Sequence, residues 1–534
     1  MAEPSDQDVV VVGGGLAGLT LALQLRQQLP AASITVLEKL PHPVPAAIHK
    51  IGESSVEIAA HYFDTVLGLK EHLLGEQLKK FGFRFFFSEG RQDIDRVTEL
   101  GASRYLATPS YQIDRGLFEN FLGQRAREQG IRFIDGCTVR ELGVGRDSRA
   151  HEVAFEAGGE PGRLTARWLV DASGRRAMLK KQLALAKPSP HNANAVWFRV
   201  GTRIAVDDWS DDPAWRHRCD PAARWLSTNH LVGRGYWVWL IPLSSGSHSI
   251  GIVADAVAHP IEEMNTFERA MDWLQRHQPR LASELEGKRH LLQDFVFFRR
   301  FSYGCKQLFS RDRWAITGEA GVFLDPFYSP GSDFIAIANT YITDLVARDL
   351  GGEPIAARAA IYGQFFDSFY ESTLTLYLGM YDLFGDAEVL PVKVLWDYTY
   401  YWGVLCQLFF QRRLTDLDAL GRLRAELLET KELNRLMQNL FREWSARGHG
   451  DAEAGLLDQA ALPWFAELNR GLTDRLDDEG FHQRMLETTA QLKSLARQVV
   501  GRAMRDAPAL DLREVEVLLA GVPDTGEGLL LATG

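Results

Sequence analysis

A glycine-rich turn near the amino terminus has the spacing that binds a dinucleotide. Asp8–Val12 is a run of β-forming residues, the turn GGGLAG follows at positions 13–18, and an apolar helical pattern extends to Leu29. A second β-forming run, Ile34–Leu37, ends at Glu38, about twenty residues after the last glycine. Glycines let the backbone approach a pyrophosphate, a helix start supplies N–H groups, and a carboxylate accepts from ribose hydroxyls. We therefore expect the cofactor to contact Gly13, Gly15, Leu16, Ala17, Gly18, Glu38 and Lys39.

Lys80 stands at the start of a stretch with unusual aromatic density. Residues Lys79–Phe87 read KKFGFRFFF, and we expect them to form a strand. The two-residue period of a strand would place Phe83 and Phe85 on one face, together with Phe81 and Phe87. Lys80 would then begin a strand whose neighbours are largely aromatic.

Two later stretches combine bulky rings with glycine and proline. Arg313–Gly331, RWAITGEAGVFLDPFYSPG, predicts a short strand and a loop, and Tyr236–Pro242, YWVWLIP, predicts a strand. The pattern from about Arg140 to Phe301 is mostly β, with a loop at Ala186–His191, and the pattern after Gly331 is mostly helical. The helical part, interrupted near Gly448–Gly450, contains many aromatic residues, which fit a buried core better than the wall of a pocket.

Two segments resemble those by which flavoproteins of the glutathione-reductase type hold FAD. Tyr111–Phe118 opens a helix, and Trp168–Arg175 ends a strand in a glycine turn. The resemblance implies an α/β, p-hydroxybenzoate-hydroxylase-like FAD-binding fold, and it favours FAD over NAD. Arg115 would then pair with a phosphate or the ribityl region, although an arginine at a helix start beside a capping Asp114 is about as good an explanation.

Three motifs resemble those of flavin-dependent halogenases. Phe323–Gly331 fits FxxPxxSxG, Trp237–Pro242 fits WxWxIP, and Gly52-Glu53-Ser54 is similar to the loop that lies along the flavin in that family. The resemblance covers roughly the first two-thirds of the chain. It implies a core at residues 1–350, interleaved with a mostly β substrate layer at about 80–110 and 190–300. A helical domain at residues 351–534 would cap the substrate site.

The resemblance also implies a reaction. Hypohalous acid is made from oxygen and chloride or bromide at reduced FAD, which a separate flavin reductase supplies, and a lysine passes it to an electron-rich aromatic substrate. Lys80 matches that lysine, and an aromatic, poorly hydrated surround would favour its neutral form. The alternative is that Lys79 and Lys80 are a solvated pair. The resemblance implies that Lys80 and Ser329 are catalytic, and that the halide binds at Ser329, Gly331 and Ser332. It adds Gly52, Ser54, Arg115, Asp325 and Gly331 to the residues that bind the cofactor. On the substrate side it implies Phe83, Phe85, Trp237, Trp239 and Tyr328.

Two positions depart from the family pattern. Tyr328 stands where tryptophan halogenases have a glutamate, and phenol and pyrrole halogenases also lack this acid because an electron-rich ring loses its proton more readily. Pro330 has no N–H at the first of the backbone positions that hold the halide in the family, which leaves Gly331 and Ser332 as donors. The sequence therefore favours a phenolic or pyrrolic substrate, free or on a carrier protein, and leaves chloride and bromide open.

Composition limits the other functional classes. The 534 residues carry a net charge of −11, which does not favour nucleic acid, and the four cysteines form no CxxC pair. No apolar run reaches the roughly 18 residues of a membrane-spanning helix, no metal-binding pattern is present, and we expect a cytoplasmic enzyme of secondary metabolism. A flavin monooxygenase or dehydrogenase on the same scaffold, or a flavoprotein without enzymatic activity, are the alternatives.

Overall fold

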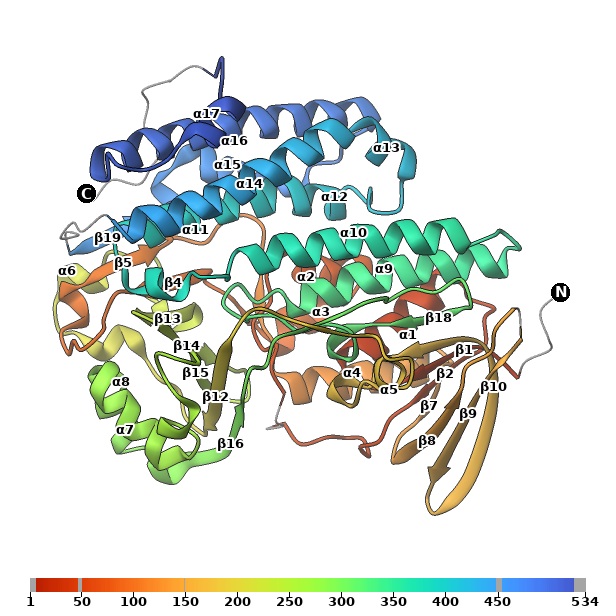
Figure 1. Cartoon of the computed structure of the whole chain (residues 1–534). Helices are drawn as coiled ribbons and strands as arrows, with labels where there is room; N and C mark the ends of the chain where they lie inside the picture. Colours follow the sequence, from red (N-terminus) through yellow and green to blue (C-terminus); the bar gives the residue numbers. More distant parts are fainter. Residues whose placement is uncertain (1–5, 47–49, 148, 448–453, 523–534) are drawn as a thin grey trace. The chain divides into compact units, whose positions relative to one another are not determined.

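The computed structural model describes residues 6–46, 50–147, 149–447 and 454–522, whose helices and strands are shown in Figure 1. The chain divides into two compact units. The first comprises Met1–Gln77, Ile113–Pro190 and Phe301–Glu371, and the second comprises Leu78–Gln112, His191–Arg300 and Ser372–Gly534. The predicted interruption at Gly448–Gly450 lies outside the described residues, and the domain boundaries expected from the sequence stay a prediction.

The first unit is built on a mostly parallel sheet of seven strands, in which β9 is antiparallel to β10 and to β8. Its central strand β1 (Gln7–Val12) lies between β2 and β10, and β7 and β18 extend the sheet on either side in the same direction. Helix α1 packs against both α4 and α9. Because the carboxyl ends of parallel strands meet at one edge, the turn after β1 opens at the edge where α/β sheets bind ligands. The predicted α/β class is confirmed. The remaining bounds are α1 (Leu16–Gln28), β2 (Ile34–Leu37), α2 (Glu57–His61), α3 (Lys70–Glu76), α4 (Arg115–Glu128), β7 (Arg132–Ile134), β8 (Cys137–Gly143), β9 (His151–Ala157), β10 (Glu160–Asp171), α5 (Met178–Gln182), β11 (Ala186–Pro188), β17 (Tyr303–Cys305), β18 (Trp314–Ile316), α9 (Gly331–Leu350) and α10 (Ala356–Thr375).

The second unit contains an eight-stranded sheet and most of the carboxy-terminal helices. The strand order is β16-β12-β15-β14-β13-β4-β5-β19. The edge strand β19 comes from the carboxy-terminal part of the chain and pairs in parallel with β5. The bounds are β3 (Leu78–Lys79), β4 (Phe83–Phe86), β5 (Thr98–Gly101), β6 (Tyr111–Gln112), β12 (Ala193–Val200), α6 (Pro213–Arg216), β13 (Thr228–Gly233), β14 (Tyr236–Pro242), β15 (His248–Asp255), α7 (Phe267–His277), α8 (Pro279–Glu286), β16 (Leu292–Phe298), α11 (Val389–Tyr400), α12 (Gln407–Phe410), α13 (Leu417–Arg422), α14 (Arg424–Ser445), β19 (Gly455–Asp458), α15 (Pro463–Arg470), α16 (Asp478–Asp506) and α17 (Arg513–Leu518).

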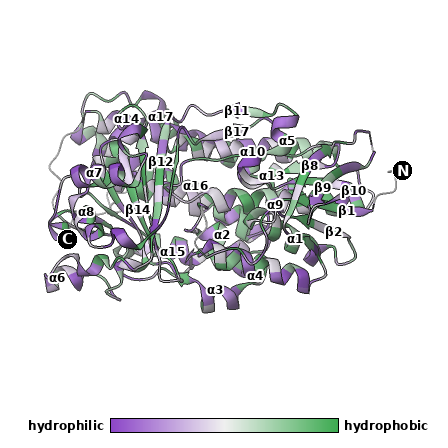
Figure 2. Ribbon diagram, turned by 90° about the horizontal axis from the view of Figure 1, so that it is seen from below, coloured by the Kyte–Doolittle hydropathy of each residue, from purple (hydrophilic) through white to green (hydrophobic). Residues whose placement is uncertain are grey.

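The two faces of this sheet differ in what they bury. One face packs its aliphatic residues, such as Val238 and Ile252, against α7 and α8 to form a core (Figure 2). The other face carries rings. His230 of β13 lies opposite Phe85 of β4 and opposite Trp239 of β14 in the strand register, so these three side chains share a face. Alternation along each strand thus separates an aliphatic core from an aromatic surface.

The strand predicted at Lys79–Phe87 is wrong in its extent. β3 ends at Lys79 and β4 begins at Phe83, because Gly82 adopts a left-handed φ of 71° that interrupts the extended backbone. Phe83 and Phe85 still point the same way, as expected, with ring centroids 6.3 Å apart. Lys80 therefore lies in a connection, not in a strand.

One other expectation needs correction, and the mostly β region is confirmed with helices added. The loop expected at Ala186–His191 is partly the strand β11, which pairs with β17. The mostly β region is interrupted by α7 and α8, whose apolar faces cover the sheet. The strand β11 forms because pairing in the folded chain overrides weak local propensity, whereas α7 follows a local pattern, with apolar residues at helical spacing and Thr266 as its cap.

Candidate functional site

The glycine turn after β1 has the geometry of a dinucleotide cradle. Gly13 has a φ of 112°, and a Cβ on it would lie 2.2 Å from Ala172 O. A Cβ on Gly18 would lie 1.9 Å from Gly13 O, so this glycine lets α1 pack against the strand. Gly15 is different, because its nearest neighbours would lie 3.7 Å away or more. The first and third glycines serve the fold, and the second leaves space for a ligand.

The acid at the end of β2 braces this turn. Glu38 Oε2 accepts a hydrogen bond from Gly14 N at 2.6 Å, and Oε1 accepts one from Leu40 N at 2.8 Å. Lys39 is exposed beside it. Glu38 thus lies at the turn, where a carboxylate is suited to accept from a ribose.

Arg115 lies at the start of α4 and holds the loop of Gly52. Its Nη1 donates to Ile51 O, and its Nη2 donates to Glu119 Oε1 at 2.6 Å. Ile113 N donates to Glu53 O at 2.5 Å. Gly52 has a φ of 97°, which residues other than glycine rarely adopt, and a Cβ there would also lie 2.8 Å from Arg115 Nη1. Ser54, two residues later, is buried.

The loop that precedes α9 contains the predicted halide residues. Asp325 is fully buried, and its Oδ1 accepts from Phe327 N at 3.0 Å, which shapes the turn. Ser329 has a left-handed φ of 54° and donates its N–H to Pro326 O at 2.8 Å. Gly331 and Ser332 are the first residues of the 20-residue α9, where N–H groups lack partners within the helix and the helix dipole favours an anion.

This loop and the Gly52 loop are neighbours within the first unit. A Cβ on Gly52 would lie 3.9 Å from Ser332 Oγ, and Ala59 N donates to Asp333 Oδ1 at 2.9 Å. Tyr328 is half-buried, with its ring 4.8 Å from that of Phe327. The fold therefore joins the glycine turn, Arg115, the Gly52 loop and the start of α9 into one site. Their close backbone approaches and cationic side chain fit FAD.

Lys80 is buried among rings in the second unit. The residue is 3% exposed, and Nζ lies 3.4 Å from the ring centroid of Phe83. Its neighbour Lys79 is exposed, with Nζ 4.6 Å from the ring of Tyr105. The expectation of a solvated lysine pair is therefore wrong for Lys80, since a buried amine over a ring is poorly hydrated.

Trp237 and Trp239 continue the aromatic face, and both are almost fully buried. Trp237 Nε1 donates to Tyr381 Oη at 3.3 Å, and Trp239 Nε1 donates to Ser249 Oγ at 3.2 Å. A Cβ on Gly251, the cross-strand neighbour, would lie 2.1 Å from the Trp239 ring. The glycine allows the indole to lie flat on the sheet, so both tryptophans are fixed in orientation.

Several site residues were missed in the sequence. His230 stacks on Phe85 with centroids 4.7 Å apart, and Tyr398 of α11 lies 6.2 Å from Phe83. His230 belongs to no recognisable motif, and Tyr398 lies in the aromatic helical part that the sequence favoured as core, so the rings that they contact depend on tertiary packing. Glu119 did leave a signal, because it follows Arg115 by four residues on a predicted helix, where opposite charges meet.

The aromatic cluster extends from Tyr398 into the carboxy-terminal part of the second unit. Trp402 lies 4.7 Å from Tyr398, and Phe465 of α15 lies 4.6 Å from Trp402, measured between ring centroids. These rings pack on the Phe83 side of the sheet, so the aromatic helix that the sequence favoured as core also adjoins the ring beneath Lys80.

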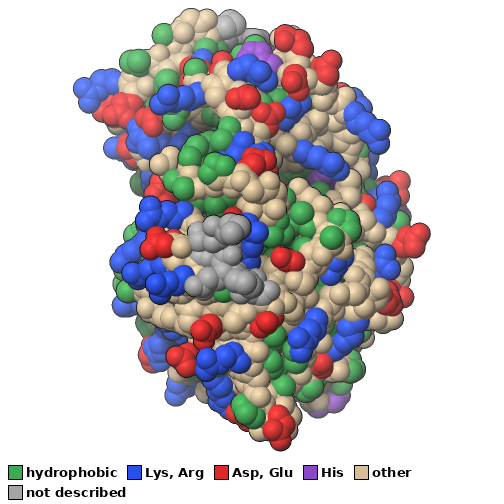
Figure 3. Space-filling view, turned by 90° about the vertical axis from the view of Figure 1, so that its right-hand side faces the viewer, with side chains coloured by type: hydrophobic (Ala, Val, Ile, Leu, Met, Phe, Trp, Pro, Cys, Tyr) green, Lys and Arg blue, Asp and Glu red, His purple; other side chains and the backbone are tan. Residues whose placement is uncertain are grey.

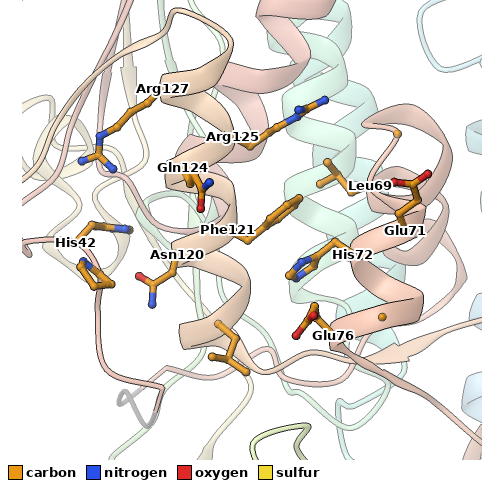
Figure 4. A pocket seen from close by; sticks show the side chains of 14 residues that line it. His42, Leu69, Glu71, His72, Glu76, Asn120, Phe121, Gln124, Arg125 and Arg127 are labelled. Atoms are coloured by element: carbon orange, nitrogen blue, oxygen red, sulfur yellow. The ribbon is translucent and has the colours of Figure 1, made fainter.

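A separate groove of about 850 Å³ lies on the first unit between α3 and α4 (Figure 4). His72 stacks on Phe121 in this groove with centroids 3.9 Å apart, and burial lowers the pKa of His72. Arg125 and Arg127 lie along α4 and pair with Glu128 and Asp135. The groove contains none of the individual site residues predicted from the sequence, and only Leu117 belongs to the segment Tyr111–Phe118.

Metal-binding clusters and membrane-spanning helices are both absent from the described residues. In that part of the chain, no three His, Cys, Asp or Glu side chains gather so as to hold a metal ion, and no helix is long and apolar enough to cross a membrane. Acidic and basic side chains intermingle on the face shown in Figure 3.

Comparison with known families identifies the class of protein. The sequence profile described as Tryptophan halogenase matches residues 88–371, more than half of the chain. The chain belongs to the tryptophan halogenase family. The profile of the NAD(P)-binding Rossmann-like domain matches residues 11–73, which include the glycine turn. The protein is thus an enzyme of the flavin-dependent halogenase class, with FAD as its cofactor.

Individual halogenases resemble this family member along most of its length. The flavin-dependent halogenase chlA of Dictyostelium discoideum is 24% identical over 465 residues, 79% of this chain and 76% of that protein. The 1H-pyrrole-2-carbonyl peptidyl-carrier-protein brominase of Pseudoalteromonas luteoviolacea is 24% identical over 362 residues, 66% of this chain and 80% of that protein. The structure of halogenase PltM in complex with phloroglucinol and FAD covers 92% of this chain and 96% of its own, with a TM-score of 0.66 at 16% identity. This likeness confirms the predicted FAD-binding fold.

Proposed function

We propose that the enzyme uses reduced FAD, oxygen and chloride or bromide to halogenate an electron-rich phenolic or pyrrolic ring through Lys80. The observation that carries this proposal is the burial of the Lys80 amine over Phe83, next to a sheet face covered with rings. When bound, reduced FAD supplies the electrons with which oxygen converts a halide to hypohalous acid. A separate flavin reductase would provide the reduced cofactor.

The residues of the first unit would bind the cofactor and the halide. Arg115 and the turn at Gly15 suit the phosphates, and the loop of Gly52, which Arg115 holds, would lie along the flavin ring. The halide would bind at Gly331 and Ser332, with the hydroxyl of Ser329. Because Pro330 offers no N–H, this site has fewer donors, and bromide, which is less strongly hydrated, should be used better than chloride.

Lys80 would hold hypohalous acid by a hydrogen bond or capture its halogen. If the acid is hydrogen-bonded, the ring carbon takes the halogen, hydroxide leaves, and the displaced ring proton converts it to water. If the amine captures the halogen, water is released in that step, and the ring carbon then takes the halogen from the nitrogen, which receives the displaced ring proton. Rings around the amine exclude bulk water, into which the oxidant would otherwise escape. Trp237 and Trp239 would keep the organic substrate from the flavin by their bulk. Tyr328 replaces an acid, so the ring itself must release its proton readily.

One relative supports the proposal that the substrate is attached to a carrier protein. The Pseudoalteromonas brominase is named for a pyrrole-2-carbonyl group on a peptidyl carrier protein. Comparing a free pyrrole or phenol acid with the same acid on a carrier protein would decide between the two forms.

We propose the cytoplasm as the location of the enzyme, which the four buried free cysteines support.

The test is turnover with photochemically reduced FAD, oxygen, bromide and an electron-rich phenol. Lys80→Ala should reduce the halogenated product at least about a hundredfold, the usual cost of removing a catalytic group. Lys79→Ala, which removes the exposed neighbour, should change the rate less than about twofold. Equal activity of the Lys80 variant would exclude the proposed role of the amine.

The same assay addresses the second candidate, a flavin-dependent monooxygenase or dehydrogenase. Such an enzyme would give hydroxylated or desaturated product at the same rate with and without bromide. The loss of one halide donor at Pro330 is the observation that favours it.

A further inference from the structure

Three charged side chains lie beside the one open glycine of the cofactor turn. Glu119 is fully buried, and its two oxygens accept from Arg115 Nη2 at 2.6 Å and from Lys50 Nζ. A Cβ on Gly15 would lie 3.7 Å from Lys50 Nζ and 3.8 Å from Glu119 Oε1. Lys50 comes from a different segment of the chain and reaches the same point as the α4 residues.

The charges of this cluster suit a pyrophosphate. Burial by itself would raise the pKa of Glu119, but Arg115 and Lys50 lower it below the ordinary value, so the carboxylate is ionised. One carboxylate between two cations leaves one net positive charge next to Gly15, and the start of the 13-residue α1 adds to it. A pyrophosphate in a dinucleotide carries two negative charges.

A buried carboxylate does not itself bind an anion, so its place beside the turn needs another reason. Glu119 fixes both cations by charge-assisted hydrogen bonds and thereby orients them toward Gly15. An ammonium has three donors, and the side chain of Lys50 is 29% exposed, so its amine can donate to a ligand as well as to the buried carboxylate. Arg115 uses more of its donors within the protein than Lys50 does, because Nη1 already donates to Ile51 O.

We infer that Lys50 is a second cation for the pyrophosphate of FAD, positioned by Glu119. The inference rests on the proposed function only for the identity of the cofactor. Lys50 directly precedes the segment Ile51–Glu53 that Arg115 and Ile113 hold, so the same residue ties this loop to the phosphate site. An arginine could replace it, whereas a neutral amide could not.

The experiment measures the dissociation constant of FAD from the full chain by fluorescence, without turnover, at several ionic strengths. Lys50→Gln should weaken binding roughly tenfold, the size of one lost charge-assisted hydrogen bond, and should make the salt dependence shallower. Lys50→Arg should restore most of both. Lys70→Gln, which removes an exposed lysine on α3, should match the natural chain in affinity and in salt dependence.

A purely structural ion pair would give a different result. In that case Lys50→Gln would lower the thermal stability of the FAD-free protein but leave the affinity for FAD and its salt dependence unchanged, and this would overturn the inference. The measurement of FAD affinity does not depend on halogenation. A protein that binds FAD but makes no halogenated product would overturn the proposed function, and the affinity of the Lys50 variants would still test the inference. A natural chain that does not bind FAD would overturn both.

Discussion

Single residues in this protein set the orientation of the rings that form its aromatic face. Trp239 lies flat because Gly251 has no side chain, and Ser249 fixes the indole N–H. The position of the Lys80 amine depends likewise on the ring of Phe83, over which it lies. Small changes at such positions alter the shape of the site without removing any group that takes part in the chemistry.

Gly251→Ala should therefore displace Trp239. The new methyl would overlap the ring, and overpacking of this kind costs about 1–3 kcal/mol in the free energy of unfolding. Chemical denaturation followed by tryptophan fluorescence measures this cost. Gly421→Ala is the matched control, since Gly421 lies in helix α13 with no atom within 4 Å of the position that a methyl group would take, and it should leave stability equal or slightly higher. Equal stability of both variants would show that the sheet adapts to the methyl.

At the scale of elements, a buried histidine ties the β8–β9 hairpin to the strand that leads into the cofactor loop. His151 Nδ1 accepts from Gly145 N at 3.1 Å, and Nε2 lies 2.9 Å from Arg313 O, just before β18. The first contact requires an unprotonated Nδ1, so the ring is neutral and Nε2–H donates. Burial lowers the pKa of His151 to about 4.

This histidine should make the protein sensitive to acid. The unfolded chain binds a proton near pH 6.5 and the folded chain only near pH 4, so the stability contributed by neutral His151 is present above pH 6.5 and is lost as the pH falls toward 4. The loss should approach about 3 kcal/mol in the free energy of unfolding. Thermal midpoints between pH 4 and 7.5 should fall less steeply for His151→Gln than for the natural chain. His217→Gln, at an exposed position, should keep the natural slope.

At the scale of the whole molecule, neither unit is a continuous piece of chain. The carboxy-terminal segment supplies the edge strand β19 to the sheet of the second unit, and Asn469 bonds Thr108 through both its side chain and its carbonyl. The family profile ends at residue 371, yet the second unit needs residues well beyond that point.

A chain ending at residue 371 should therefore fail to fold its second unit. It would leave β5 as an open edge and expose the rings that Tyr398 and its neighbours cover, both of which promote aggregation. We expect this truncation in the insoluble fraction of an expression test. A chain ending at residue 510, which lacks α17, should stay in the soluble fraction and elute in the same way as the full chain. Recovery of the chain ending at residue 371 in the soluble fraction would show that β19 and the carboxy-terminal helices are dispensable for folding.

The sequence by itself determined the cofactor turn, because glycine spacing and the acid after β2 are local properties that a helix start and a strand end fix directly. It also determined which face of β4 carries Phe83 and Phe85, since alternation follows from the extended backbone. Gly82 indicated a break, because a glycine often interrupts a strand, but the aromatic residues on both sides of it favoured one continuous strand.

Only the tertiary structure decided which charged and aromatic residues meet. Lys50 and Glu119 are 69 positions apart and join at Gly15, and Tyr398 reaches Phe83 from a distant helix. It also decided that Lys80 is buried while Lys79 is exposed, a difference that two adjacent lysines cannot reveal. The physical reason is that burial and long-range pairing depend on how segments pack, and a local pattern carries no information about which distant segment will cover it.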